Sequence, residues 1–340
     1  MSTLSISSTG LSDAATCLAK YRYHLVDHLI SRPENISKPI RRGIWLHRCL
    51  QDHHCGRDWQ KSLARLMGQA LEWKLDADAM QEIYDECRLL MLSYVGFWRD
   101  DNWKIVADEQ EYRATFGDVE LRATIDTAVR IPGHGLVIVE HKSTSDIPPA
   151  AWRAVDPQTA LQIILMGANG LRVDEVLFNY IDTSPKVPRV TEKRAFHAST
   201  GVTTTAHFDQ AAAELDAKIR RFAADLSAPA TVFDPDYETY VKDKRAEYVN
   251  DEKFFQRYYV KREPALLRET LLDVRGLVDR IQRAEAMGHY PRSLNVFTCK
   301  SCFYNHAALC PTEYVKGAPS EVLRTEQFQL DTGYREGNVV

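Results

Sequence analysis

Residues 137–143 read Val-Ile-Val-Glu-His-Lys-Ser, three β-branched residues followed at once by a carboxylate, an imidazole and an ammonium group. The apolar run, which begins at Leu136, predicts a strand that is buried on both faces. Because side chains alternate across a strand, Glu140 and Lys142 share one face and the His141 imidazole points to the other. The Glu-x-Lys pair could be an ordinary surface ion pair, or it could be half of a metal site.

A hairpin leads into this strand. Residues 104–116, "KIVADEQEYRATF", and 119–131, "VELRATIDTAVRI", alternate apolar and polar residues on either side of Gly117-Asp118, and "PGHG" at 132–135 predicts the next turn. The second of these strands carries Asp126, so Asp126 and Glu140 can reach the same end of the sheet. Two carboxylates held close together repel unless a cation lies between them.

Helices are expected around these strands. "DPQTALQIILMGANGL" predicts a helix that ends at Asn169-Gly170, and "EVLFNYI" (175–181) predicts a fourth strand. Upstream, one helix is expected to start at Ser12 or Asp13, and helices continue from "RRGIWLHRCLQDHH" to about Trp98. Helical patterns return from about 205 to 288, where "FFQRYYVKR" (254–262) suits either an amphipathic helix or a stretch that stacks bases. The order predicts an α/β core with helical elaboration.

Composition sets limits on the protein's class. The chain has 340 residues, enough for one large domain or two, with 44% hydrophobic and 26% charged residues, as in soluble globular proteins. A net charge of −4 gives no overall basic character, so any DNA binding would use a local groove. We see no signal peptide and no membrane span, so a cytoplasmic, reducing location without a membrane partner is expected.

The cysteines need their own explanation. The chain has seven, an odd number that argues against a disulfide framework in a reducing compartment. Three of them crowd into "CKSCFYNHAALC", as Cys299, Cys302 and Cys310. Three thiolates do not complete a tetrahedral site, so a metal bound here would take a fourth ligand from elsewhere, with His306 one candidate for zinc. Three buried free cysteines are the alternative.

Together these residues resemble the PD-(D/E)XK nucleases, in particular the branch similar to the nuclease domains of RecB- and AddB-type repair helicases and many phage exonucleases. In that family an Asp ends one strand and Glu-x-Lys ends the next, as Asp126, Glu140 and Lys142 do here. The family's Gly-x-x-x-His on an upstream helix is matched by Gly43 and His47.

Other positions match the family in part. Gln158 corresponds to the Gln on the helix after the Glu-x-Lys strand. Gln162 stands where family members often have Tyr, and no Gly shortly precedes Asp126. The resemblance implies a PD-(D/E)XK restriction-endonuclease-like core, a mixed sheet flanked by helices, with large helical insertions and a C-terminal cysteine cluster.

The resemblance also implies an activity. It implies a deoxyribonuclease that uses Mg²⁺ or Mn²⁺, an exonuclease acting on DNA ends or single strands in recombination, repair or phage DNA processing. His47, Asp126, Glu140 and the backbone carbonyl of His141 would bind the metal, and Lys142 would assist the water or the transition state. Gln158 would orient the substrate or Lys142. A structure-specific or nicking endonuclease, or a weakly catalytic DNA-binding subunit of a recombination complex, are the alternatives.

The cysteines extend the resemblance to both ends of the chain. The similar nucleases place one cysteine on an N-terminal helix and three after the core, which implies a [4Fe-4S] cluster on Cys17, Cys299, Cys302 and Cys310, with structural Zn²⁺ as the alternative. Such a cluster would clamp the two ends together.

A single nuclease domain over 1–340 is therefore expected. Its expected parts are N-terminal helices (1–48), a helical insertion (49–103), the catalytic core (104–190), a helical region (205–288), an iron–sulfur segment (289–315) and a tail (316–340). The candidate DNA contacts are Arg22, Arg41, Arg42 and Gln162. The partners implied are single-stranded DNA or duplex ends, with a helicase or a single-strand annealing protein alongside.

Overall fold

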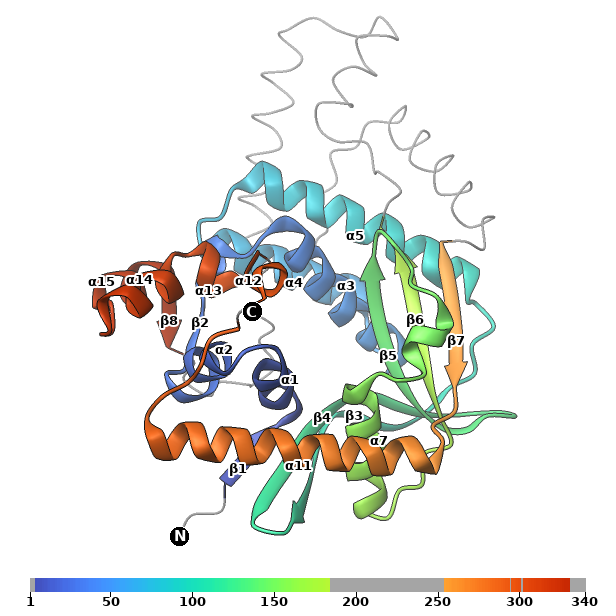
Figure 1. Ribbon diagram of the computed structural model, residues 1–340. Coiled ribbons are helices and arrows are strands. Elements are labelled where there is room, and N and C mark those ends of the chain that lie inside the picture. The colour runs from blue at the N-terminus through green and yellow to red at the C-terminus, as the bar shows by residue number, and fades with distance from the viewer. Residues whose placement is uncertain (1–3, 184–253, 294, 301, 331–340) are drawn as a thin grey trace, which may run out of the picture.

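A mixed sheet of six strands forms the centre of the protein (Figure 1). The computed structural model describes residues 4–183, 254–293, 295–300 and 302–330, so the part of the expected helical region between 205 and 253 lies outside the described residues. The strand order is β1–β4–β5–β6–β7, with β3 paired to β4. The strands are β1 (Leu4–Ser7), β3 (Lys104–Phe116), β4 (Val119–Ile131), β5 (Gly135–Thr144), β6 (Glu175–Asp182) and β7 (Phe255–Val260).

The expected strand pairings are confirmed. Strands β3, β4 and β5 are consecutive antiparallel neighbours, and the first turn uses Gly117 at φ +66°, a conformation that favours glycine. Helix α7 (Pro157–Ala168) carries the chain to β6, which lies parallel to β5. Asp156 caps this helix by accepting a hydrogen bond from the backbone N–H of Thr159. Asn169 and Gly170 end it, as the sequence predicts.

Strand β4 is the hub of the sheet. Along one edge it pairs with β3 over nearly its whole length. Its other edge pairs first with β1, in parallel at Val119 to Arg122, and then with β5, from Thr127 to Ile131. The gap between these two pairings falls at residues 123–126, which places Asp126 where β1 and β5 diverge.

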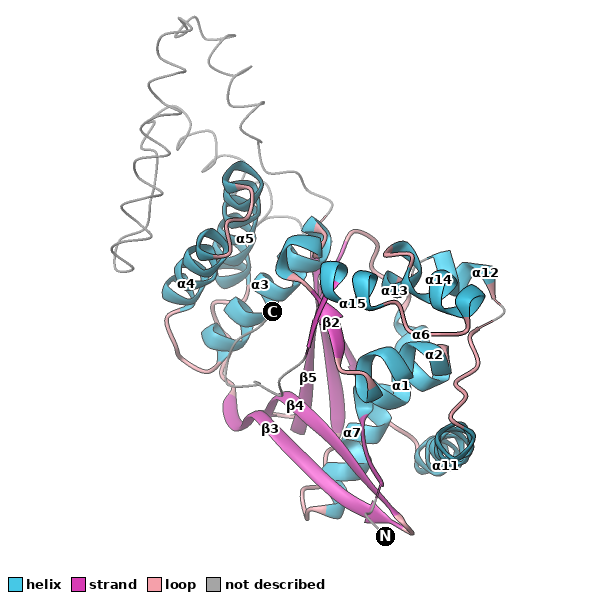
Figure 2. Ribbon diagram, turned by 90° about the vertical axis from the view of Figure 1, so that its left-hand side faces the viewer, coloured by secondary structure: helices cyan, strands magenta, loops and turns pink. Residues whose placement is uncertain are grey.

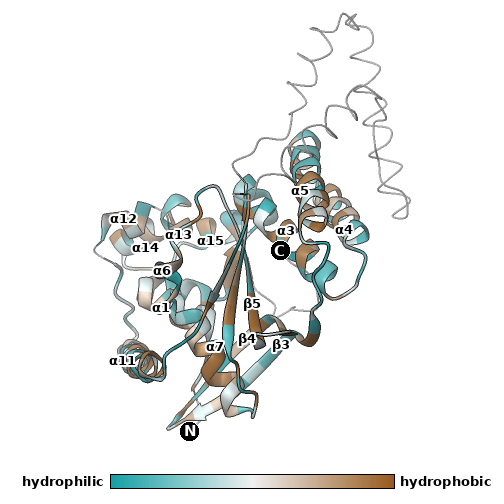
Figure 3. Ribbon diagram, turned by 90° about the vertical axis from the view of Figure 1, so that its right-hand side faces the viewer, coloured by the Kyte–Doolittle hydropathy of each residue, from teal (hydrophilic) through white to brown (hydrophobic). Residues whose placement is uncertain are grey.

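Helices cover both faces of the sheet (Figure 2). Helices α1 (Ser8–Thr16), α7 and α11 (Pro264–Met287) pack on one face around a large hydrophobic cluster. On the other face α3 (Lys38–His54) lies against β5, with α4 (Trp59–Glu72) and α5 (Ala77–Phe97) packed around it in a second cluster. Strand β5 lies between these layers and is hydrophobic over much of its length (Figure 3).

The N-terminal helix begins earlier than the sequence pattern suggests. Residues Leu4–Ser7 form β1, and Ser7 caps α1 by accepting a hydrogen bond from Gly10 N–H at 3.1 Å. The expected start at Ser12 or Asp13 is therefore wrong. Cys17, in an extended conformation (φ −168°, ψ 122°), interrupts the helix before α2 (Leu18–Tyr21) and a π-helical turn at Arg22–Val26.

The stretch "FFQRYYVKR" is not an amphipathic helix. Its residues Phe255–Val260 form β7, which pairs antiparallel with β6. The two ends of this strand, Phe255 and Val260, are buried in the core. Aromatic and β-branched residues fit a half-buried strand better than a helix, and that preference decides the structure here.

The C-terminal segment returns to the N-terminal part of the chain. Strand β8 (Phe328–Leu330), within the region expected to be a tail, pairs antiparallel with β2 (Leu29–Ser31). Short helices precede it: α12 (Val296–Lys300), α13 (Phe303–His306), α14 (Leu309–Lys316) and α15 (Glu321–Gln327). Two other short elements are the 3₁₀ turn Pro33–Asn35 and α6 (Ala150–Arg153). None of the helices in the described residues has the length and apolar run that crossing a bilayer requires.

Candidate active site

Two neighbouring strands carry the acidic residues of the candidate site. The antiparallel register joins Thr127 to Val139, and its continuation sets Asp126 beside Glu140. Lys142, two residues farther along β5, donates a hydrogen bond from Nζ to Glu140 Oε1 at 2.5 Å. The structure thus brings together the three residues that the sequence singled out, at the end of the β4–β5 ladder.

Helix α3 adds an imidazole to this group. His47 Nε2 lies 3.5 Å from Asp126 Oδ2. One turn earlier in the helix, Gly43 faces Ser143 of β5, and a Cβ atom at Gly43 would lie 3.2 Å from Ser143 Oγ. A larger residue would therefore crowd the Ser143 hydroxyl, which would have to give way by a few tenths of an ångström. The Gly-x-x-x-His pattern has a physical reason here, because the glycine allows the close approach that positions the histidine.

The Glu140 carboxylate is buried and only half satisfied. Its residue is 4% exposed, and while Oε1 is bound to Lys142, Oε2 has no hydrogen-bond partner among the described residues. A buried carboxylate oxygen without a partner is costly, and it is an unusual feature in a folded protein. The pKa of Lys142 is raised, because the attraction of Glu140 outweighs the burial that by itself would lower it.

The pKa of Asp126 is also shifted by its surroundings. Although 27% of its side chain remains exposed, burial raises the pKa of Asp126 to about 6. That value is the net result of all causes: the nearby charges of Glu140 and Glu109 also raise the pKa, while His47 and Lys142 lower it. Burial of the carboxyl is therefore the largest cause of the raised pKa, and the two neighbouring carboxylates add to it.

Glu109 is a member of this acidic group that the sequence patterns did not reveal. In the β3–β4 ladder Asp108 pairs with Thr127 and Gln110 with Ile125, so Glu109 lies between them, across from Asp126. Its φ of +49° is in the left-handed region, which is uncommon for a residue other than glycine. The alternation breaks here, with four polar residues in a row at 108–111, but nothing in that run singles out Glu109.

The donor set fits a divalent cation. Two carboxylates and an imidazole suit Mg²⁺ or Mn²⁺, and the partnerless Glu140 oxygen and the raised pKa of Asp126 both mark a site where positive charge would be stabilising. As they stand, no three Cys, His, Asp or Glu side chains of the described residues lie close enough together to hold a metal ion. Binding would therefore draw the carboxylates together.

The other residues predicted from the sequence form no hydrogen bond with the Asp126 and Glu140 carboxylates in the part of the chain that the structure describes. Gln158, the second residue of α7, is exposed. Gln162 is buried and donates from Nε2 to the carbonyl of Thr124 at 3.3 Å, while its Oε1 has no partner among the described residues. The His141 imidazole is also buried and packs against α3 on the other side of β5, as the strand alternation predicts.

The predicted DNA-binding arginines are occupied within the protein. Arg41 is only 4% exposed and donates to the carbonyl of Pro33, which leaves it little surface for DNA. Arg42 is paired with Glu86 and also donates to Thr183. Arg22 is paired with Asp27 at 3.2 Å and remains partly exposed.

The four cysteines singled out by the sequence come from both ends of the chain to one region. Cys17, Cys302 and Cys310 pack against the same small hydrophobic cluster. Cys17 Sγ accepts a hydrogen bond from Ser293 N–H at 3.2 Å, and Cys299 Sγ contacts the carbonyl of Ser293 at 3.7 Å. Burial raises the pKa of Cys310, and the other three thiols raise it further. Cys49 and Cys87 are buried in the helical layer.

Comparisons with known proteins agree with this geometry. No curated protein matches the chain closely enough to count as a relative. The family described as the PD-(D/E)XK nuclease superfamily matches residues 5–311, a range that includes nearly all of the six-stranded sheet, His47, Asp126, Glu140 and Lys142. This match covers most of the chain. The protein belongs to the PD-(D/E)XK nuclease superfamily.

Proposed function

We propose that the protein is a metal-dependent deoxyribonuclease that degrades DNA from ends or in single strands, and that Asp126, Glu140 and Lys142 carry the reaction. Membership of the superfamily implies hydrolysis of phosphodiester bonds with Mg²⁺ or Mn²⁺. The observation that carries the assignment to this site is the buried Glu140 carboxylate, with one oxygen bound to Lys142 and the other without a partner. The preference for ends rests on the sequence resemblance to exonucleases.

Each side chain of the site has a separate role in the proposed reaction. Asp126, Glu140 and His47 would hold the metal ion, which supplies charge neutralisation at the scissile phosphate and a more acidic water. The Lys142 ammonium, fixed by Glu140, would orient the attacking water and neutralise charge that develops on the phosphate oxygens. As water attacks phosphorus, the bond to the leaving sugar oxygen breaks and that oxygen takes up a proton. Gln158 would orient the DNA or Lys142 from the start of α7.

The test uses end-labelled linear and closed circular single-stranded DNA with Mg²⁺ or Mn²⁺, and then with EDTA. Wild-type protein, purified without oxygen, is compared with Glu140→Gln, which keeps the shape of the side chain and removes its charge. Glu120→Gln is the matched control, because Glu120 lies on β4 and contacts only Ser5 and Arg113 in the described residues. We expect metal-dependent loss of the linear DNA by the wild type and the control, and none by Glu140→Gln.

Each other outcome assigns a different function. Cutting of the circle would favour a structure-specific or nicking endonuclease. Binding of DNA without cutting, by folded wild-type protein, would favour a DNA-binding subunit. Unchanged activity in Glu140→Gln would show that the reaction takes place elsewhere in the molecule.

The cysteines support a second part of the proposal, a [4Fe-4S] cluster held by Cys17, Cys299, Cys302 and Cys310. In its support, three of these thiols pack against one hydrophobic cluster, and the fourth shares Ser293 with Cys17. The charges of the other three also raise the pKa of Cys310, which means that four thiolates here would repel one another without a cation.

Iron and acid-labile sulfide in anaerobically purified protein test this part. We expect both in the wild type, together with visible absorption, and their loss in Cys299→Ser but not in Cys55→Ser. Cys55 is a suitable control because it lies at the end of α3, away from the C-terminal segment. Zinc in place of iron would assign a structural Zn²⁺ site, and absence of both metals would leave four free thiols.

A further inference from the structure

A row of polar side chains crosses three strands on the face of the sheet opposite Glu140. His141 of β5 pairs in register with Asn179 of β6, and Asn179 pairs with Arg257 of β7. All three side chains are buried. Burying polar groups lowers the stability of a protein unless they are hydrogen-bonded. A row of three buried polar side chains across a sheet therefore suggests a functional role.

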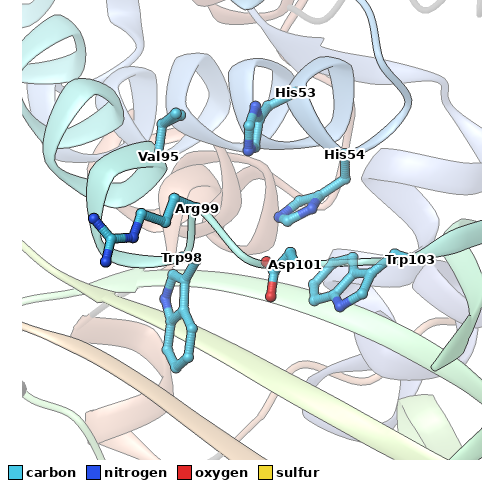
Figure 4. Close-up of a pocket in the computed structure, with 7 residues that line it drawn as sticks. All are labelled: His53, His54, Val95, Trp98, Arg99, Asp101 and Trp103. Atoms are coloured by element: carbon cyan, nitrogen blue, oxygen red, sulfur yellow. The ribbon is translucent and has the colours of Figure 1, made fainter. Parts of the chain in front are cut away.

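Arg257 is the fixed end of this row. Its two terminal nitrogens donate to the two oxygens of Asp101 at 2.6 Å each. Its guanidinium stacks on Trp98, 3.7 Å from the ring centroid, and lies 4.7 Å from that of Trp103. Trp98, Asp101 and Trp103 also line a cleft of about 240 Å³ (Figure 4). The arginine is thus held in one orientation, and a guanidinium can only donate hydrogen bonds.

Because Arg257 can only donate hydrogen bonds, it fixes the orientation of the Asn179 amide. Arg257 Nε lies 3.2 Å from Asn179 Oδ1, so the amide oxygen must face the arginine. The amide NH₂ then faces His141 Nδ1, at 2.8 Å. The Nδ1 atom must accept this bond, because Asn179 Nδ2 has only hydrogens to offer. The neutral His141 ring therefore carries its proton on Nε2, a buried atom that has no hydrogen-bond partner among the described residues.

The same reasoning about donors and acceptors fixes the direction of the hydrogen bonds at Tyr94. Its hydroxyl oxygen accepts from Arg257 Nη2 at 2.9 Å and from Asn179 Nδ2 at 2.8 Å. The hydroxyl hydrogen is left for His54 Nε2, also at 2.8 Å, so His54 carries its proton on Nδ1. One arginine thus fixes the proton positions of two imidazoles.

These two imidazoles lie next to the candidate metal site. The His54 ring stacks on His141 with centroids 5.4 Å apart, and the His47 ring stands perpendicular to His141 at 5.8 Å. His141 is also the residue between Glu140 and Lys142 in the chain. A shift or rotation of the His141 ring would therefore displace His47, and also Glu140 and Lys142 on either side of it in β5.

We infer that Arg257 and Asn179 are positioning residues for the metal site: they hold His141 as the Nε2–H tautomer, and this buried ring keeps His47 and the Glu140–Lys142 stretch in place. The inference rests on the proposed function, since it assumes that this site binds the metal. Partners that orient a metal site from outside it are worth about 10–100-fold in metal affinity or activity.

Asn179→Asp tests the inference with little change of shape. An aspartate at 179 keeps the contact with Arg257, but its carboxylate can only accept, so the His141 proton should move to Nδ1. Two-bond ¹H–¹⁵N spectra of histidine-labelled protein without metal report the tautomer, and the His141 signals are assigned by their loss in His141→Gln. We expect Nε2–H in the wild type and Nδ1–H in Asn179→Asp.

Metal binding is measured in parallel by titration calorimetry with Mn²⁺. We expect a loss of affinity of about 10–100-fold in Asn179→Asp, as for other such partners. Asn169→Asp, at the exposed end of α7, adds the same charge and should bind Mn²⁺ as the wild type does. Arg257→Lys, which keeps the charge but loses the Nε donor, should give a mixture of His141 tautomers and a smaller loss of affinity. It also serves if Asn179→Asp does not fold.

The outcomes separate this inference from the proposed function. If the wild type binds no Mn²⁺ and cuts no DNA, the proposed function fails. If the wild type binds Mn²⁺ but the variants with a changed tautomer bind it equally well, the positioning role is overturned. Nδ1–H in the wild type would overturn the inference directly.

Discussion

At the scale of single residues, Glu140 and Lys142 depend on each other. The glutamate is buried, and its one bonded oxygen is bound to the lysine, whose pKa is raised in return. The sequence placed both side chains on one face from strand alternation alone. It could not reveal Glu109, whose charge helps to raise the pKa of Asp126, because no sequence pattern marks the left-handed backbone conformation of that residue.

Lys142→Ala should abolish most of the DNA cleavage. The substitution removes the ammonium that would stabilise the developing phosphate charge, so we expect a loss of about 100-fold or more in single-turnover rate at saturating Mg²⁺. Lys104→Ala, at the exposed start of β3, is the control and should keep the wild-type rate. Full activity in Lys142→Ala would remove this lysine from the mechanism.

At the scale of elements, the core strands and their helix could be predicted because each carries a strong local pattern. The hairpin at Gly117, strand β5 and helix α7 all lie where the sequence indicates. Strands β1 and β7 were missed for physical reasons: β1 has only four residues, and β7 gains its stability from pairing with β6, which is distant in sequence. Local preference favours a strand at β7, but a short apolar run whose partner strand is distant in sequence is hard to tell from a helix by pattern alone.

The approach of α3 to β5 through Gly43 predicts a rescue experiment. Gly43→Ala should weaken Mn²⁺ binding, since its Cβ would meet Ser143 Oγ at 3.2 Å and displace the helix that carries His47. It should not lower the free energy of unfolding much, because alanine favours a helix over glycine by about 1 kcal/mol. Adding Ser143→Ala removes the obstructing oxygen and should restore the affinity measured by calorimetry. An affinity that stays low in the double variant would contradict this account.

The end of α3 is tied to β3 by a network that predicts a pH dependence of stability. Asp108 accepts hydrogen bonds from Arg57 and from Gln51. Burial alone would raise the pKa of Asp108, but these partners outweigh it and lower the pKa below 3.8. A carboxylate with a lowered pKa stabilises the fold above its unfolded-state pKa, and the contribution is lost as the pH falls through the folded-state pKa.

Asp108→Asn should therefore be less stable than the wild type at pH 7, by about 1–2 kcal/mol. The difference should persist down to about pH 5 and shrink below about pH 4, where Asp108 of the unfolded chain becomes protonated and, at lower pH, that of the folded protein follows. Urea denaturation at several pH values measures it. A difference that stays constant down to pH 3 would show that the charge of Asp108 is not what stabilises this contact.

At the scale of the whole molecule, the two ends of the described chain are joined by ordinary side chains as well as by the cysteine region. Arg324 of α15 is paired with Glu313 at 2.6 Å and with Asp27 at 2.8 Å. Arg32 donates to the carbonyls of Thr325 and Phe328, next to the β2–β8 pairing. The sequence indicated that the ends meet only through its cysteines. It gave no sign of these contacts, because each joins residues that are far apart in the chain.

Arg324→Ala should destabilise this junction strongly. The buried Glu313 carboxylate would lose its counter-charge, which costs about 3 kcal/mol. Denaturation of the protein measures the loss, and hydrogen exchange of β8 shows whether it is local. Arg275→Ala, which removes an exposed pair with Asp118, should leave the stability nearly unchanged, because water screens that pair. Equal stability of the two variants would contradict a stabilising role for the junction.

The β2–β8 pairing also has a consequence for protein synthesis. A ribosome makes residues 29–31 early and residues 328–330 late, so β2 must wait for its partner while nearly everything between them is translated. The central sheet can form during this interval, because all its strands precede residue 261. Closure of the N-terminal segment, and with it the gathering of Cys17 beside the C-terminal cysteines, would be the last event. In a nascent chain, Asp126 and Glu140 would therefore be in place in the sheet before Cys17 and the C-terminal cysteines come together.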